Sequence, residues 1–240
     1  MKITKRNILS YKKNGFLIVN NVLKKKDLEL INLVLKELEK TQVDSRGVSE
    51  PGVAKSLIHS LHKNKTLIQL IENSRWFQSI SKKLLDTNSV SVFNAKSNLK
   101  RKWNGTVEYY HQDFMYWKEH GIVSSKMLNC MIFVDNHSHL NGGLWIFPGS
   151  HKKLYKHTSF LNINSLHKYF IHPKLLDKIS LKFKPMSVSA KKGSCIFFDS
   201  KLIHGSSHNI SPKDRRILLY DVSTTKHYKN PYSNYWGKTW

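Results

Sequence analysis

A histidine and an aspartate lie two residues apart, at His111 and Asp113, in a segment that alternates aromatic and polar residues over 108–117. Such alternation is typical of a half-buried β-strand, and residues two apart on a strand project from the same face. A neutral imidazole beside a carboxylate supplies two of the three ligands of the 2-His-1-carboxylate set, which holds Fe(II) and leaves positions open. The pair therefore predicts a metal site, provided that the fold brings a second histidine to it.

A suitable second histidine is His204, 91 residues after Asp113. A glycine and Ser206 follow it, and Arg215 opens the next apolar run. On a strand beside a metal, a guanidinium can bind a carboxylate through two parallel hydrogen bonds, and a hydroxyl can add another. A 2-oxoglutarate molecule that chelates iron could place its far carboxylate there. The preference for Arg215 over Arg216 rests on spacing alone, because neighbours on a strand face opposite ways.

The secondary structure expected from the sequence changes from helices to strands near residue 88. Before it, apolar residues recur at helical spacing, and we expect helices over 4–13, 25–40, 56–71 and 74–86, with a strand at 15–19. After it, short apolar runs separated by turn residues predict strands. This pattern favours a mainly β fold with α-helices, in which a double-stranded β-helix (jelly-roll) core is flanked by N-terminal helices. The strand candidates are 90–92, 107–111, 128–134, 144–147, 186–188, 194–198 and 217–222.

The length of 240 residues suits one domain with a sizeable core. We expect an N-terminal helical part over about 1–88, the jelly-roll core over about 89–225 and an aromatic tail over 226–240. The tail could fold over the mouth of the site. Residues 41–55 contain Gly and Pro and predict a loop, which is either a functional lid or a surface loop without a functional role.

The formal net charge of +24 is high enough to raise nucleic acid as a partner. The basic residues are scattered, however, and only six of the forty are arginine, the residue better suited to base and phosphate recognition. We therefore interpret the charge as a compositional bias towards lysine, and nucleic acid is not an expected partner. An anionic or zwitterionic small molecule is compatible with this charge.

Two further observations concern the compartment. No segment approaches eighteen uninterrupted apolar residues, so no spanning helix and no membrane partner are expected. The two cysteines, Cys130 and Cys195, lie in apolar runs and are interpreted as buried free thiols of a reducing compartment. We expect a cytoplasmic protein, and the sequence leaves its oligomeric state open.

Longer motifs connect these residues with a known family. His111-Gln-Asp113, the segment Asn-Gly-Gly-Leu-Trp-Ile-Phe-Pro-Gly-Ser-His at 141–151, and His204-Gly-Ser followed by Arg215 resemble the phytanoyl-CoA dioxygenase family. Its members are Fe(II)- and 2-oxoglutarate-dependent oxygenases with a jelly-roll core. The resemblance runs from about 94 to 222 and is greatest to ectoine hydroxylase-type small-molecule hydroxylases. It implies that His111, Asp113 and His204 bind iron, that Arg215 binds 2-oxoglutarate, and that O2 is the second co-substrate.

The resemblance also implies contacts for the two organic molecules. Lys100 falls where these enzymes direct a lysine to 2-oxoglutarate, and Met131 falls where many have a tryptophan in the wall of that pocket. Asn94 matches a polar substrate contact that is a glutamine in ectoine hydroxylase, so the same substrate is not assumed. Trp117 matches an aromatic residue at the mouth of the site. Gln112, between two ligands, is counted with the substrate contacts, whereas His137 and His139 are left out because they lie in a turn-rich segment.

The expected function is hydroxylation of an unactivated C–H bond in a small polar molecule, such as an amino acid derivative, with succinate and CO2 as co-products. Related halogenases leave the position of Asp113 small, so the carboxylate favours hydroxylation or another oxidation over halogenation. Two alternatives stay open. One is a jelly-roll protein that binds a ligand or metal without catalysis, and the other is a basic nucleic-acid-associated protein.

Overall fold

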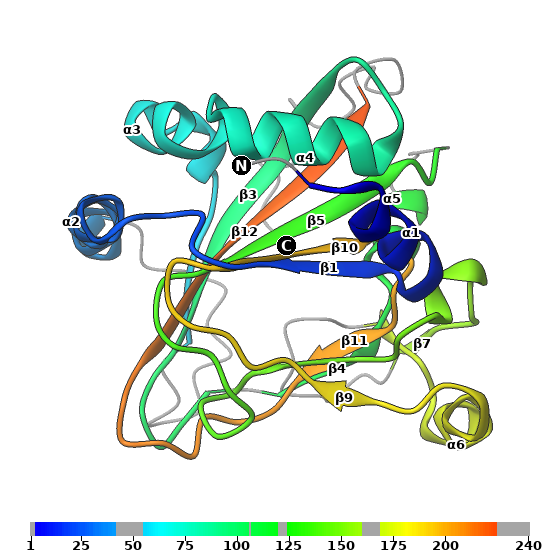
Figure 1. Cartoon of the computed structure of the whole chain (residues 1–240). Helices are drawn as coiled ribbons and strands as arrows, with labels where there is room; N and C mark the ends of the chain where they lie inside the picture. The colour runs from blue at the N-terminus through cyan, green and yellow to red at the C-terminus, as the bar shows by residue number, and fades with distance from the viewer. Residues whose placement is uncertain (1–2, 42–54, 106, 120–123, 160–168, 225–240) are drawn as a thin grey trace.

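The computed structural model describes residues 3–41, 55–105, 107–119, 124–159 and 169–224 (Figure 1). Most of the loop expected at 41–55 and the whole tail at 226–240 lie outside the described residues. Within the described part, no helix is long and apolar enough to cross a membrane. The α-helices are α1 (Lys5–Asn14), α2 (Lys25–Thr41), α3 (Lys65–Leu67), α4 (Arg75–Leu85), α5 (Asp113–Glu119) and α6 (Pro173–Lys182), with shorter helical segments at Leu61–Lys63, Ile68–Glu72 and Ser150–Lys152.

Two antiparallel sheets form the core of the fold (Figure 1). The larger sheet has the order β1 (Phe16–Val19), β10 (Cys195–Asp199), β5 (Met127–Phe133), β12 (Arg215–Thr224), β3 (Val90–Lys100) and β2 (Lys55–Ile58). The smaller sheet has the order β4 (Glu108–His111), β11 (His204–Ser206), β6 (Leu144–Ile146) and β9 (Met186–Ser187), and β7 (Thr158–Ser159) pairs with β8 (Tyr169–Phe170). The jelly-roll core flanked by N-terminal helices is thus confirmed.

Successive residues of β12 face opposite sides of the larger sheet, and apolar side chains are buried on both sides. Leu218, Tyr220 and Val222 belong to the apolar core under the helices, where the ring of Phe77 from α4 lies 5.8 Å from that of Tyr220. Figure 1 shows α4 lying across this outer face. Ile217 belongs to a second core between the two sheets. Burial on both faces fixes the register of β12, because a slip of one residue would exchange the two sets.

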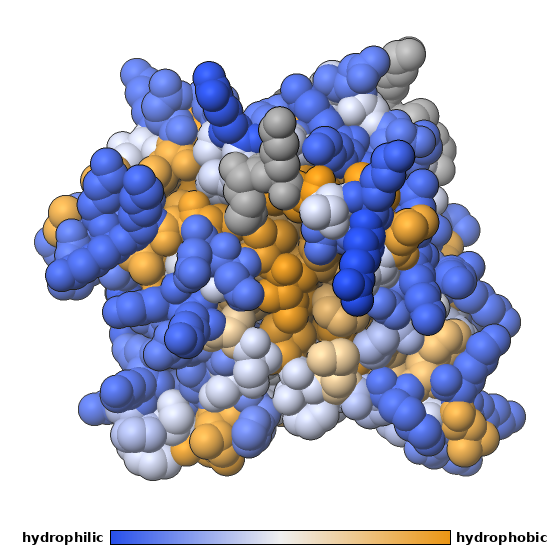
Figure 2. Space-filling view, in the orientation of Figure 1, coloured by the Kyte–Doolittle hydropathy of each residue, from blue (hydrophilic) through white to orange (hydrophobic). Residues whose placement is uncertain are grey.

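The core between the sheets shares Met131, Leu144, Ile217 and Leu219 with the wall of a pocket. Figure 2 shows apolar side chains in the middle of the outer face over β1 and β10. The members of the core between the sheets are buried and come from β5, β6, β10 and β12 and from the adjoining turns. They are Met131, Phe133, Leu144, Ile146, Val188, Ile196, Phe198, Leu202, Ile217 and Leu219.

Two expectations about secondary structure were wrong, and one helix was not foreseen. Residues 55–58 are not helical but form β2, whose Leu57 pairs with Asn98 on β3, so strand pairing overrides the local helical spacing. Asp113 does not continue a strand beyond His111 but begins α5. Helix α6, which begins with Pro173 at its first turn, was not expected.

Candidate active site

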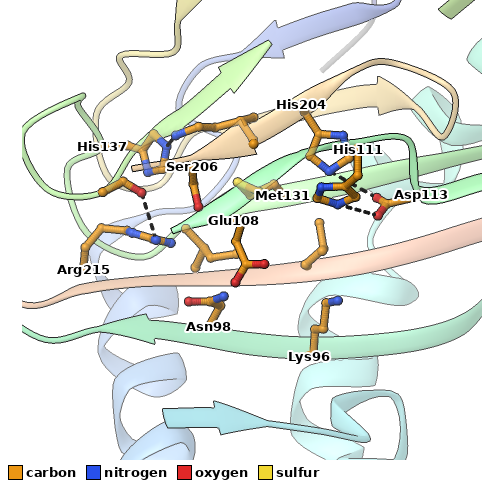
Figure 3. Close-up of a pocket in the computed structure, with 15 residues that line it drawn as sticks. Lys96, Asn98, Glu108, His111, Asp113, Met131, His137, His204, Ser206 and Arg215 are labelled. Carbon is orange, nitrogen blue, oxygen red and sulfur yellow. Dashed lines mark hydrogen bonds and ion pairs between the residues drawn. The ribbon is translucent and has the colours of Figure 1, made fainter. Parts of the chain in front are cut away.

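Three potential metal ligands meet where β4 and β11 pair. His111 ends β4, Asp113 begins α5, and His204 begins β11 and pairs with His111 across the sheet. One ligand atom from each residue lies within 4.8 Å of the others (Figure 3). Nε2 of His111 is 3.2 Å from Asp113 Oδ1, and Nε2 of His204 is 3.4 Å from Asp113 Oδ2. The fold therefore brings together the three ligands expected from the sequence.

Backbone carbonyls fix the tautomer of both histidines. Nδ1 of His111 lies 2.7 Å from the carbonyl oxygen of Tyr109, and Nδ1 of His204 lies 2.9 Å from that of Leu202. A carbonyl only accepts hydrogen bonds, so each Nδ1 carries the proton and each Nε2 presents its lone pair. Metal-binding histidines are commonly oriented in this way. The donor set fits Fe(II).

The protonation states of the ligands also suit a metal. Burial lowers the pKa of His204 to about 4, so the imidazole is neutral at pH 7. Burial alone would raise the pKa of Asp113, but its interactions with His204 and His111 hold that pKa well below its ordinary value. A carboxylate and neutral imidazoles are the forms that coordinate a cation.

A pocket extends from these ligands between the two sheets (Figure 3). It contains about 540 Å³ of empty space, part of which is open to solvent. The metal ligands lie at one end and Arg215 at the other, with Glu108 between them, and apolar residues form part of its wall. The lining residues are Lys96, Asn98, Glu108, His111, Asp113, Met131, His137, Gly142, Leu144, His204, Gly205, Ser206, Arg215, Ile217 and Leu219.

Arg215 is a buried cation at the end of the pocket away from Asp113 (Figure 3). Its NH2 group donates to the carbonyl oxygen of Gly142 at 3.0 Å, and its Nε donates to that of Asn141 at 3.4 Å. Burial lowers its pKa to about 10, so the guanidinium stays charged at pH 7. No described carboxylate lies within ion-pair distance of it. The carboxylates of Glu108 and Asp135 stabilise this charge without direct contact. A buried guanidinium that no described carboxylate contacts suits an anionic ligand at this end of the pocket.

Lys100 adds a second buried cation at the same end. It pairs with Arg215 between β3 and β12, and its side chain is fully buried. Its Nζ donates to Ser206 Oγ at 2.7 Å and to the carbonyl oxygen of Ser207 at 2.5 Å, both uncharged. Arg216 instead faces away and forms two hydrogen bonds with Asp135. Arg215 and Ser206 thus line the pocket, and Lys100, which is not a lining residue, reaches it through its hydrogen bond to Ser206.

Comparison with known proteins decides the family. The phytanoyl-CoA dioxygenase (PhyH) family matches residues 11–217, which is most of the chain. The chain belongs to the phytanoyl-CoA dioxygenase family. It is an Fe(II)- and 2-oxoglutarate-dependent dioxygenase that acts on a small molecule.

Relatives and solved structures agree with this assignment. Ectoine dioxygenase of Bordetella bronchiseptica is 24% identical over 239 residues, which cover 93% of this chain and 76% of the relative. L-proline trans-4-hydroxylase of Streptomyces griseoviridis is 23% identical and covers 87% of this chain and 82% of its own length. The crystal structure of EctD from S. alaskensis with 2-oxoglutarate and 5-hydroxyectoine matches with a TM-score of 0.78 at 19% identity, over 94% of this chain and 77% of that one. At this identity, the structural match establishes the fold.

Of the residues expected to contact 2-oxoglutarate or the substrate, some line the pocket and others do not. Met131 lines the pocket. Asn94 donates to Asp221 Oδ2 at 2.6 Å, and the ring of Trp117 packs edge-on against Phe93 with centroids 4.8 Å apart. Neither is among the lining residues. Their expected substrate contacts stay predictions.

Gln112 is placed away from the pocket. Its Nε2 donates to the carbonyl oxygens of Lys153 and Lys201, and its Oε1 accepts from the backbone N–H of Tyr155. The side chain is fully buried. Its two amide hydrogens and its oxygen thus join three segments of backbone, and the expected substrate contact of Gln112 stays a prediction.

Glu108 and His137 are two titratable residues of the pocket that sequence reasoning did not assign to the site. Glu108 lies between Arg215 and the ligand cluster in Figure 3, and His137 lies beside Ser206. The only available signal for Glu108 was its closeness to His111. His137 had been set aside because of its turn-rich surroundings.

Asn129 connects the larger sheet with the acidic metal ligand. It is fully buried on β5, and its Nδ2 donates to Asp113 Oδ2. This bond restrains the carboxylate in the orientation that directs its oxygens at both histidines. Partners of metal ligands commonly act in this way.

We expect the substitution Asn129→Leu to weaken Fe(II) binding by about 10- to 100-fold, the range typical of losing such a partner. The affinity is measured anaerobically by competition with a chelator of known strength. Asn98→Leu is the matched control, because Asn98 lines the pocket but makes no hydrogen bond with Asp113 that the structure records. Equal weakening by both substitutions would show that the effect is not specific to the carboxylate.

Proposed function

We propose that this dioxygenase hydroxylates a C–H bond of a small polar molecule that carries a carboxylate or a similar anionic group, such as an amino acid derivative. Lys96 is the observation that carries this proposal. It lies on β3 at the ligand end of the pocket, where Figure 3 shows its side chain beneath Asp113. The side chain is half-buried, and its charge favours the ionised forms of Asp113 and Asp221. Within the described residues, no hydrogen bond or ion pair with its amine is found.

The position of Lys96 separates it from the other cations of the pocket. Lys100 and Arg215 lie at the opposite end, where they suit the far carboxylate of 2-oxoglutarate. Lys96 is close enough to the metal ligands to help lower the pKa of Asp113. An anionic group bound there would hold an adjacent C–H bond near the metal position. Such positioning is a large part of what an enzyme contributes to a reaction between bound molecules.

In the proposed reaction each pocket residue has a distinct task. His111, Asp113 and His204 hold Fe(II), and Arg215 orients 2-oxoglutarate from the far end. When bound, the metal supplies the activation of O2, with 2-oxoglutarate converted to succinate and CO2 and one oxygen atom inserted into the substrate C–H bond. The apolar wall of the pocket, to which β6 and β12 contribute, limits the access of water.

The substrates named for two relatives support an anionic group. Ectoine and L-proline, from the names of the relatives above, are both small molecules with a carboxylate. Another structural neighbour is the epimerase SnoN from nogalamycin biosynthesis, with a TM-score of 0.72 at 15% identity over 92% of this chain and 82% of that one. The same fold therefore serves other reactions. The carboxylate of Asp113 favours hydroxylation or another oxidation over halogenation, and the proposal of hydroxylation is supported by the names of the two relatives.

The remaining expectations have less support. No observation favours a nucleic-acid-associated role, and membership of an enzyme family argues against a binder without catalysis. Cys130 and Cys195 are both buried and free, which supports the proposed cytoplasmic location.

The test uses pairs of small molecules that differ only in charge. We expect carboxylates such as ectoine and L-proline to stimulate succinate release, and the matched amide L-prolinamide to do so weakly. Lys96→Met should raise KM for a carboxylate substrate by roughly 10- to 100-fold, as expected for the loss of a hydrogen bond to a charged group. Lys102→Met is the control, because Lys102 is exposed just beyond β3. Equal stimulation by acids and amides, unchanged by Lys96→Met, would remove the support for an anionic substrate.

A further inference from the structure

His137 lies in the wall of the pocket at its arginine end. It follows β5 in the chain, is only 3% exposed, and packs against the ring of Phe133 with centroids 4.5 Å apart. Figure 3 shows it on the same side of the pocket as Ser206 and Arg215. A histidine so deeply buried has a restricted choice of hydrogen-bond partners.

The backbone determines which nitrogen of His137 carries the proton. Its Nε2 accepts a hydrogen bond of 2.8 Å from the backbone N–H of Leu144. That nitrogen must therefore present its lone pair, so the proton of the neutral ring is on Nδ1. Burial and the positive charges of Arg215 and Lys100 hold the pKa of His137 well below its ordinary value, which keeps the ring neutral. His137 consequently offers one hydrogen-bond donor, Nδ1–H.

This donor has no recorded acceptor. Nδ1 of His137 is buried, and no hydrogen bond joins it to any described residue. A buried N–H without an acceptor is unfavourable, and in native proteins such a group commonly serves a ligand or an ordered water. The Leu144 bond prevents the ring from reversing to use its other nitrogen, so the unsatisfied donor is fixed in place.

The surroundings of this donor specify the chemistry of the ligand. Arg215 and Lys100 supply two positive charges, and Ser206 supplies a hydroxyl that already accepts from Lys100. A carboxylate has about four lone-pair directions and can accept from several donors at once. The arrangement thus suits one carboxylate that receives hydrogen bonds from cationic and neutral donors together.

We propose that His137 is a specificity-determining residue for the co-substrate, in which Nδ1–H donates to the far carboxylate of 2-oxoglutarate beside Arg215. This inference rests on 2-oxoglutarate binding in the orientation given above. A 2-oxo acid without the far carboxylate would leave the donor unsatisfied. His137 therefore contributes to the preference for a dicarboxylate, and it contributes nothing to the chelation of iron by the 2-oxo acid end.

The experiment compares two 2-oxo acids of equal chain length. The Fe(II)-loaded protein is titrated anaerobically with 2-oxoglutarate or with 2-oxopentanoate, in which a methyl group replaces the far carboxylate, and the visible charge-transfer band of the chelate gives each dissociation constant. His137→Leu removes the donor, and His137→Asn places an amide N–H near the position of Nδ1. His139→Leu is the control, because His139 is an exposed histidine two residues away.

We expect His137→Leu to raise the dissociation constant of 2-oxoglutarate by about 10-fold or more, since a hydrogen bond to a charged group is lost. The constant for 2-oxopentanoate should change less than about two-fold, because that molecule makes no use of the donor. His137→Asn should recover part of the loss, and His139→Leu should have no effect. Equal weakening of both acids by His137→Leu, or no change in either, would overturn the inference. Absence of the band with both acids in the unchanged protein would instead show that the co-substrate assignment itself is wrong.

Discussion

Replacing His204 with alanine is expected to reduce 2-oxoglutarate-dependent turnover by roughly 10³-fold or more, because residues that act as one catalytic unit leave little activity when one is lost. The substitution removes one of the two imidazoles that converge on Asp113 and leaves a site with too few ligands to hold Fe(II). Succinate formation measures turnover. The anaerobic charge-transfer band measures binding, and it should be lost in parallel.

The matched control for this substitution is His208→Ala. His208 is exposed, and its Nδ1 lies 2.5 Å from the carbonyl oxygen of Gly105, away from the ligand cluster. The chain thus offers two histidines four residues apart, only one of which points at Asp113. Turnover that survives His204→Ala but is abolished by His208→Ala would mean that His208 and not His204 binds the metal. That result would contradict the site.

Replacing Arg215 with methionine is expected to raise the dissociation constant of 2-oxoglutarate by about 10²-fold or more, the scale for losing one member of a buried charged pair. The buried guanidinium donates to the carbonyl oxygens of Gly142 and Asn141, and no described carboxylate forms an ion pair with it, so a bound carboxylate is its natural partner. Anaerobic titration of the Fe(II)-loaded protein gives the constant. Iron affinity measured in the absence of 2-oxoglutarate should be unchanged.

Arg216→Met is the corresponding control. Arg216 is the next residue on β12, but its guanidinium binds both carboxylate oxygens of Asp135 on the other face. Its loss is expected to lower stability slightly and to leave 2-oxoglutarate affinity within about two-fold, since a partly exposed ion pair contributes little. A larger effect on affinity from Arg216→Met than from Arg215→Met would reverse the assignment of the two arginines.

The metal ligands were predictable because short-range spacing and long-range motifs agreed. His111 and Asp113 indicated a site on their own, and the Gly-Ser that follows His204 identified the distant partner. The local geometry was less predictable. The aromatic alternation suggested a continuous strand, whereas the chain turns into α5 at Asp113. Short apolar segments are compatible with either structure, and tertiary context decides between them.

The pocket residue Glu108 was hidden by an irregularity in strand pairing. His204 pairs with His111, but Ser206 pairs with Glu108, so two steps along β11 correspond to three along β4. Such a bulge changes which residues of a strand face inward. In a regular strand, Tyr109 would face the pocket together with His111, but its side chain is exposed. A bulge has no signal in this short segment, so Glu108 could be found only from the structure.

The substrate contacts were the least predictable part. Asn94 and Gln112 are polar residues near the ligands in sequence, but both are hydrogen-bonded within the protein, Asn94 to Asp221 and Gln112 to backbone groups. Asp221 is 127 residues from Asn94, and no local pattern reveals that pairing. Lys96 differs because its amine has no such recorded partner, and this difference is visible only once the fold is known.

The most direct test of the central claim is an anaerobic titration of the unchanged protein with Fe(II) and then with 2-oxoglutarate. We expect one Fe(II) and one 2-oxoglutarate to bind per chain, with a weak visible charge-transfer band that appears only when both are present. Tight binding of Fe(II) without the band on addition of 2-oxoglutarate would contradict the co-substrate site at Arg215. Failure to bind Fe(II) at all would contradict the cluster of His111, Asp113 and His204 as a metal site.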